Sequence, residues 1–206
     1  MTPRRLRRLI VAAAAAALLL GAAVWAVLIL RGAGDGLDLS YVKTDLIRVN
    51  ENSRPGLKLE TVRNIVIHYV GNPGSSAKAN RNYFDRLGDP KANPAGTAAS
   101  AHGVVGLEGE VLQCIPVTEI AYANYPRNGD TVSVEVCHPD ESGEFLPATY
   151  ATLVRLTSDL CRHFGLTEKD VIRHYDVSGK LCPKYYAENA EAWQSFLNDV
   201  AGALQP

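Results

Sequence analysis

The chain has 206 residues, of which 47% are hydrophobic and 21% are charged, and its formal net charge is -1. This length fits one ordinary domain with an appendage, and this apolar content excludes a chain that lacks a packed core. The near-neutral charge gives no indication of nucleic-acid binding, so nucleic acid is not expected as a partner.

The N-terminal segment 1–31 is expected to form a basic cytoplasmic stub and a membrane anchor. Four arginines among the first eight residues precede an uncharged apolar run over 9–30. At about 1.5 Å per residue this run can cross a bilayer as a helix, and the positive-inside rule places the following chain outside the cytoplasm. The alternative is a cleaved signal peptide, but its apolar core would be shorter and would end at a small-residue cleavage site. We therefore expect a single-pass protein with an extracytoplasmic domain, which is secreted if the segment is cleaved.

The chain after the anchor is expected to divide into a linker or arm over 32–56 and a single domain over 57–206. The linker begins with a Gly-rich stretch, and the Pro55-Gly56 pair is a turn signal just before the domain. Within the domain, strand-like and helix-like stretches alternate. This alternation predicts the α/β class, with a single mixed central β-sheet flanked by helices and preceded by the N-terminal transmembrane helix.

Strands are predicted where β-branched residues cluster, where a hairpin pattern occurs or where polarity alternates with period two. These stretches are 64–70, 101–105, 111–115, 131–137 and the short piece 171–173. Helices are predicted where apolar residues recur at helical spacing between capping residues. These stretches are 77–87, capped by Ser75 or Ser76, then 147–164, ended by Gly165, and 187–204. In 131–137, alternation places Val132, Val134 and Val136 on one face and Glu135 on the other.

The chain contains four cysteines, Cys114, Cys137, Cys161 and Cys182. Outside the cytoplasm a disulfide is allowed, but the sequence does not identify a pair. If Cys182 binds a metal ion, at most one disulfide can form among the other three. The other interpretation is that these cysteines are small buried apolar residues.

The segment 171–186 places His174, Lys180 and Cys182 close together. His and Cys are good side-chain ligands for zinc, and a third ligand is expected from His68, at the end of the apolar stretch that starts at residue 64. Three protein ligands leave a fourth position open, which is typical of a catalytic zinc and would acidify a bound water. An amide hydrolase also needs a proton carrier, for which Glu135 is suited, and positive charge beside the developing oxyanion, which Lys180 would supply.

These motifs together resemble the zinc-dependent N-acetylmuramoyl-L-alanine amidases. Members of this family are the peptidoglycan-cleaving domains of phage endolysins and bacterial autolysins, and they are related in fold to peptidoglycan recognition proteins. The resemblance rests on IVIHY around His68, on VSVEVC around Glu135 and on the spacing within HYDVSGKLCP, and it covers about 57–204.

The resemblance implies a Zn2+ ion held by His68, His174 and Cys182, with Glu135 and Lys180 as catalytic residues. It implies hydrolysis of the amide bond between N-acetylmuramic acid and the L-Ala of the stem peptide. Peptidoglycan is therefore the implied partner, beside the membrane contacted through 9–30. Nothing in the sequence indicates an oligomer, so a monomer is the default expectation.

Two positions depart from the family's pattern. Ala101 stands where some relatives carry a catalytic Tyr, so a Tyr-assisted mechanism is not expected and Glu135 bears more of the proton transfer. Gly103 stands where many relatives have an aromatic residue, which changes the expected shape of the groove near His102. His102 itself is expected either to touch substrate or to brace the sheet.

The other histidines are expected to be structural. His138 lies between a strand end and Pro139, where a role in a turn suffices. His163 lies in the last turn of the helix over 147–164, where a partial positive charge suits the helix dipole.

Two other functions compete with the hydrolase. One is a non-catalytic peptidoglycan-binding or sensing module, although relatives that only bind typically lack the Cys ligand that Cys182 supplies here. The other is a structural zinc domain with four protein ligands, or an amidase for a different substrate such as an anhydro-muropeptide.

Overall fold

The computed structural model describes residues 39–205, whose centre is a six-stranded sheet in the order β1-β4-β3-β5-β2-β6. The strands are β1 (Val42–Thr44), β2 (Asn64–Ile67), β3 (Gly103–Val105), β4 (Val111–Gln113), β5 (Thr131–Val136) and β6 (Val171–Arg173). β3 and β4 form the predicted antiparallel hairpin, and the other neighbouring strands pair in parallel. The mixed central sheet is therefore confirmed.

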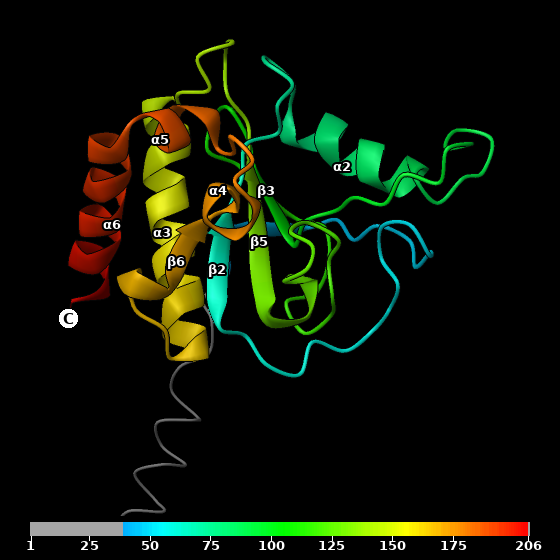
Figure 1. Cartoon of the computed structure of the whole chain (residues 1–206), viewed down its shortest axis with the longest axis horizontal. Helices are drawn as coiled ribbons and strands as arrows, with labels where there is room; N and C mark the ends of the chain where they lie inside the picture. The colour runs from blue at the N-terminus through cyan, green and yellow to red at the C-terminus, as the bar shows by residue number, and fades with distance from the viewer. Residues whose placement is uncertain (1–38, 206) are drawn as a thin grey trace, which may run out of the picture. The chain divides into compact units, whose positions relative to one another are not determined.

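Helices cover both faces of this sheet (Figure 1). They are α2 (Ala77–Arg86), α3 (Pro147–Phe164), α4 (His174–Ser178), α5 (Lys184–Glu188) and α6 (Ala190–Leu204), with 3-10 turns at η1 (Asn128–Asp130) and η2 (Glu168–Asp170). α3 and α6 lie against one face, and α2 lies on the opposite side. The predicted valine face of β5 faces α3 and α6, because Val132, Val134 and Val136 belong to the same apolar cluster as Leu153 and Phe196.

The helix boundaries follow from local capping. Ser76 is the N-cap of α2, where its side chain accepts a hydrogen bond from the Ala79 N–H at 3.2 Å. Gly165 ends α3 with a φ of +67°, in the left-handed region that glycine adopts without strain. The single terminal helix predicted over 187–204 is wrong in one respect. Asn189 accepts a hydrogen bond from the Ala192 N–H and starts a new helix, so the chain there divides into α5 and α6.

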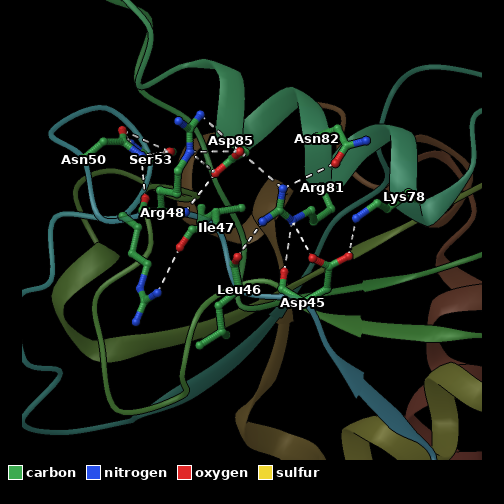
Figure 2. A network of polar contacts seen from close by, with 11 residues as sticks. Asp45, Leu46, Ile47, Arg48, Asn50, Ser53, Lys78, Arg81, Asn82 and Asp85 are labelled. Carbon is green, nitrogen blue, oxygen red and sulfur yellow. Dashed lines mark hydrogen bonds and ion pairs between the residues drawn. The ribbon is translucent and has the colours of Figure 1, made fainter.

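The arm predicted within 32–56 contributes a strand to the sheet. β1 pairs in parallel with β4, and Ile47, just beyond β1, is fully buried. A network of polar contacts then joins the arm to α2 (Figure 2). Within it, the Arg81 guanidinium donates to the carbonyl oxygens of Asp45 and Leu46 and pairs with the Asp45 and Asp85 carboxylates at 3.1 and 3.4 Å. Residues 39–56 thus belong to the same compact unit as the rest of the described chain.

The predicted anchor over 9–30 lies outside the described residues. Between residues 39 and 205, no helix combines the length and the apolar character that a membrane span requires.

All four cysteines lie within the described residues, where each is buried and has a free thiol. Burial raises the pKa of Cys114, Cys137 and Cys161 to about 12, so these thiols stay protonated. They therefore pack as small buried side chains, which is the second of the two interpretations drawn from the sequence.

Candidate metal centre

Three adjacent parallel strands bring the candidate residues to one edge of the sheet. In the β5-β2-β6 part of the sheet, Ile67 pairs with Val134 on one side and with Arg173 on the other. The next residue along each strand is His68, Glu135 and His174, respectively. Because the carboxyl ends of parallel strands meet at the same edge, these three side chains emerge side by side. Alternation places them on the face opposite the β5 valines.

Cys182 reaches the same edge through a short return of the chain. α4 begins at His174 and ends at Ser178, and its C-cap Gly179, with a φ of +76°, turns the backbone. The Tyr175 N–H then donates to the Cys182 carbonyl oxygen at 2.9 Å, which closes the turn and fixes where the thiol lies. The spacing recognised in the sequence thus corresponds to the short helix α4 and the turn that leads the chain back to the sheet edge.

The nitrogen and sulfur atoms that His68, His174 and Cys182 offer all lie within 4.8 Å of one another. His68 Nδ1 is 3.7 Å from Cys182 Sγ, and the two imidazole rings have centroids 4.7 Å apart. His68 and Cys182 are buried, and His174 is partly exposed toward a groove. The structure therefore brings the three expected ligands together.

These residues fit a bound zinc ion. His174 Nδ1 is buried and has no hydrogen-bond partner in the described chain, as expected of a ring nitrogen whose partner is a metal. Burial and the nearby His174 lower the pKa of His68 to about 3, so its imidazole is neutral and keeps a lone pair. Burial raises the pKa of Cys182 to about 12, and a metal ion would stabilise its thiolate. Two neutral imidazoles and one thiolate form a typical donor set for zinc.

Glu135 and Lys180 line the same groove as the three candidate ligands. Glu135 Oε2 is buried and has no hydrogen-bond partner among the described residues. Burial raises the pKa of Glu135 to about 8, and the nearby Lys180 acts in the opposite direction. Lys180 is exposed, so its ammonium group can approach a bound substrate from the rim. The rest of the groove is lined by Tyr69, Val70, Gly71, Phe84, Ala98, Ala99, Ser100, Tyr122 and Ala123.

His102 lies outside this groove and braces the sheet. Its Nδ1 accepts a hydrogen bond from the Ser133 N–H at 2.9 Å, and its Nε2 then donates to the Glu119 carbonyl oxygen at 2.9 Å. With both ring nitrogens satisfied and the side chain buried, His102 has a structural role, one of the two roles expected from the sequence. Ala101 is also buried, and its methyl side chain offers no polar group to the groove.

The remaining histidines lie away from the centre. His138 Nδ1 contacts the Asp140 carbonyl oxygen at 2.7 Å within the turn that follows β5, as expected of a turn residue. His163 is exposed in the last turn of α3. Neither belongs to the group of metal-ligating side chains found among residues 39–205.

Sequence reasoning missed one residue at the centre, Asn124. Its side chain is buried, and its Oδ1 lies 3.3 Å from Nε2 of His68. A lone asparagine in a loop carries no motif, so no local pattern identifies it. Asn124 reaches the centre because the loop after residue 121 folds back over the end of β2.

The sequence profile of the N-acetylmuramoyl-L-alanine amidase family matches residues 58–185. The chain is 32% identical over 175 residues to N-acetylmuramoyl-L-alanine amidase CwlL of Bacillus licheniformis, covering 79% of this chain and 47% of that protein. It is 32% identical over 187 residues to N-acetylmuramoyl-L-alanine amidase BlyA of Bacillus subtilis strain 168, covering 81% and 48%. The chain thus spans about half the length of these relatives.

Solved structures show the same architecture. The catalytic domain of XlyA superimposes with a TM-score of 0.64 and 25% identity, covering 77% of this chain and 98% of that one. The structure of PlyL superimposes with a TM-score of 0.65 and 22% identity, covering 77% and 96%, and supports the fold alone.

Proposed function

Because the chain belongs to the N-acetylmuramoyl-L-alanine amidase family, we propose that it hydrolyses the amide bond between N-acetylmuramic acid and the L-Ala of the stem peptide in peptidoglycan. The observation that carries this proposal is the convergence of His68, His174 and Cys182, whose ligand atoms lie within 4.8 Å of one another. We propose Zn2+ as the metal, because this mixed nitrogen and sulfur donor set suits zinc better than the hard cations that prefer oxygen ligands.

Zinc bound by His68, His174 and Cys182 would polarise the scissile carbonyl and acidify a water molecule beside it. The protein's own contribution is proton transfer and charge compensation. Glu135, at the carboxyl end of β5, takes a proton from the attacking water and delivers it to the departing amine nitrogen. In the metal-free chain burial raises the pKa of Glu135 to about 8, and the charge of a bound zinc ion would act in the opposite direction, toward the carboxylate that accepts the proton of the water. Lys180, at the rim of the groove, offsets the negative charge that develops on the carbonyl oxygen.

The test compares the wild-type chain with Cys182→Ser. Wild type is expected to contain zinc and to release new L-Ala amino termini from purified peptidoglycan, and a zinc chelator is expected to stop this release. Cys182→Ser is expected to lose both bound zinc and release, because a serine hydroxyl is a poor zinc ligand. Metal analysis by mass spectrometry and amino-terminal labelling of the digest measure the two effects.

Cys161→Ser is the matched control. Cys161 is also buried, but it lies in α3 and its Sγ faces the Thr167 carbonyl oxygen at 3.8 Å. This variant is expected to keep zinc and activity. Zinc-loaded wild type that leaves peptidoglycan uncut would contradict the proposed activity.

We also propose that the domain acts outside the cytoplasmic membrane, tethered by residues 9–30. The support is the sequence alone, in which four arginines precede an uncharged apolar run. In intact spheroplasts, the full-length chain is expected in the membrane fraction, with its domain open to added protease. A domain that stays protected until the cells are lysed would contradict this location.

A further inference from the structure

We propose that Asn124 is a positioning residue that fixes the ring orientation and the tautomer of His68. Asn124 precedes η1, and its side chain is 1% exposed. Its Oδ1 lies 3.3 Å from Nε2 of His68, on the side of the ring opposite the ligand atom Nδ1. The inference rests on the zinc centre proposed above, because it concerns how one of the three ligands is presented.

The hydroxyl of Thr131 decides which way the Asn124 amide faces. Thr131 Oγ1 lies 2.7 Å from the Arg127 carbonyl oxygen and 2.5 Å from Asn124 Nδ2. A carbonyl oxygen can only accept, so the single hydroxyl proton of Thr131 goes to Arg127. The Thr131 oxygen must then accept from Asn124, and only the NH2 end of the amide can donate. The carbonyl end of Asn124 therefore faces His68.

The protonation of His68 follows from this orientation. Since Asn124 presents an acceptor, the nitrogen of His68 that faces it must carry the proton, so the neutral ring is the Nε2–H tautomer. Nδ1 is then unprotonated, and its lone pair is directed to the side where Cys182 Sγ lies at 3.7 Å. A metal-ligating histidine usually donates its other N–H to a fixed acceptor, which sets the tautomer and the basicity of the ligand nitrogen.

The acceptor itself is held from two directions. Ser133, on β5, donates its hydroxyl to Asn124 Oδ1 at 2.6 Å. Asn128 accepts from the N–H groups of Ala123 and Asn124 at 3.0 and 2.8 Å, which fixes the backbone of the loop. The amide of Asn124 is thus held by its own loop and by the strand next to β2, so it can keep the ring of His68 in one orientation.

The first test uses the metal-free wild-type chain at full length. Nitrogen-15 NMR of the histidine side chains reports which ring nitrogen carries the proton. His68 is expected to show a protonated Nε2 and an unprotonated Nδ1. The opposite tautomer, in wild type that still binds zinc, would overturn the positioning role and leave the metal centre intact. Wild type that binds no zinc would instead contradict the metal centre itself.

The second test measures zinc affinity in two variants by competition with a chromophoric chelator. Asn124→Leu keeps the approximate size of the side chain and removes the acceptor. It is expected to bind zinc about 10- to 100-fold more weakly and to show mixed His68 tautomers. Asn124→Asp keeps an acceptor toward Nε2, and the Thr131 hydroxyl can turn from Arg127 to donate to the second carboxylate oxygen. This variant is expected to retain the Nε2–H tautomer and to bind zinc more tightly than Asn124→Leu.

Asn93→Leu is the matched control for the loss of a buried asparagine. Asn93 is buried and hydrogen-bonded to Leu87 and Thr97, outside the groove. This variant is expected to lose stability without any change in zinc affinity or in the His68 tautomer. Equal zinc affinity in wild type and Asn124→Leu would overturn the proposal, as would an equal loss in the Leu and Asp variants. If Asn124→Leu does not fold, the wild-type tautomer and Asn124→Asp decide the question.

Discussion

The Glu135 carboxyl lies in the groove with its Oε2 atom buried and without a hydrogen-bond partner in the described chain. Burial raises its pKa to about 8, against the opposing effect of Lys180. A carboxyl group with such a pKa can exchange protons near neutral pH, which suits a general acid or base. The same burial opposes folding once the group ionises, so the residue that serves the reaction is expected to reduce stability.

Because burial disfavours the ionised carboxylate, Glu135→Gln is expected to change the stability of the metal-free protein in a pH-dependent way. Between the ordinary pKa of 4.5 and the raised value of about 8, the folded wild type holds a proton that the unfolded chain releases. The wild type therefore loses stability as the pH rises through this window. The free energy of unfolding of Glu135→Gln should rise relative to that of wild type across the window, and the difference should stay constant above it. Urea unfolding at about pH 5, 6, 7 and 8 measures the difference.

The variant should also release L-Ala termini about 10²- to 10⁴-fold more slowly when loaded with zinc, because the proton carrier is gone. Glu51→Gln, on an exposed turn, controls for the loss of one negative charge. A stability difference between wild type and Glu135→Gln that stays constant from about pH 5 to 8 would show that the carboxyl titrates normally.

At the scale of elements, a polar network joins the arm to α2, beside the apolar cluster that Ile47 shares with Phe84. Arg81 is its centre, because it bonds two carbonyl oxygens of the arm and two carboxylates. Its side chain is only 11% exposed, so the ion pairs are shielded from water. α2 carries Phe84, which lines the groove, so the network also fixes one wall of the candidate site.

Arg81→Ala is expected to lower the free energy of unfolding by about 2–4 kcal/mol, because it leaves two carboxylates without their shielded partner. The exposed Arg86→Ala, one turn further along α2, should change it by less than about 0.5 kcal/mol. The hydrogen bond from Lys78 and the charge of Arg81 lower the pKa of Asp45. The stabilisation by Arg81 should therefore begin to shrink as the pH falls below the ordinary Asp pKa of 3.8, and be lost as the pH falls through the lowered pKa of folded Asp45. Equal unfolding midpoints for the two variants would contradict this role.

At the scale of the whole molecule, the arm is part of the domain that it was expected to lead to. It supplies β1 at the edge of the sheet, the fully buried Ile47, and Arg54, whose guanidinium contacts the Glu119 carboxylate at 2.7 and 2.8 Å. The family profile starts only at residue 58, so the arm's own residues in these contacts lie outside the matched segment.

This arrangement predicts that two truncated chains behave differently. A chain that begins at Leu37 should unfold cooperatively, because it keeps the whole compact unit. A chain that begins at Leu57 loses β1 and Ile47, whose side chain alone contributes about 2–5 kcal/mol, and should unfold at a clearly lower temperature or without a cooperative transition. Circular dichroism during heating measures both. Identical transitions would mean that the arm adds nothing to the fold.

Much of the fold could be predicted from the sequence, because it depends on local patterns. The extent of α3, the valine face of β5 and a serine cap of α2 at Ser75 or Ser76 follow from periodicity and capping within a few residues, and the structure selects Ser76 as the cap. β1 could not be predicted, since three residues become a strand only by pairing with β4. The break between α5 and α6 depends on one cap, Asn189, inside an otherwise helical pattern.

By itself the sequence determined the α/β class, the family and the types of residue at the candidate centre, because motif spacing and hydrophobic periodicity are short-range properties of the chain. The anchor over 9–30 and the location of the domain outside the cytoplasm stay predictions. Only the tertiary structure decided that His68, Glu135 and His174 emerge side by side, that His102 braces the sheet, and that Asn124 faces His68. The physical reason is that strand register and buried hydrogen bonds join residues far apart in sequence, and no local pattern encodes which distant partner each will meet.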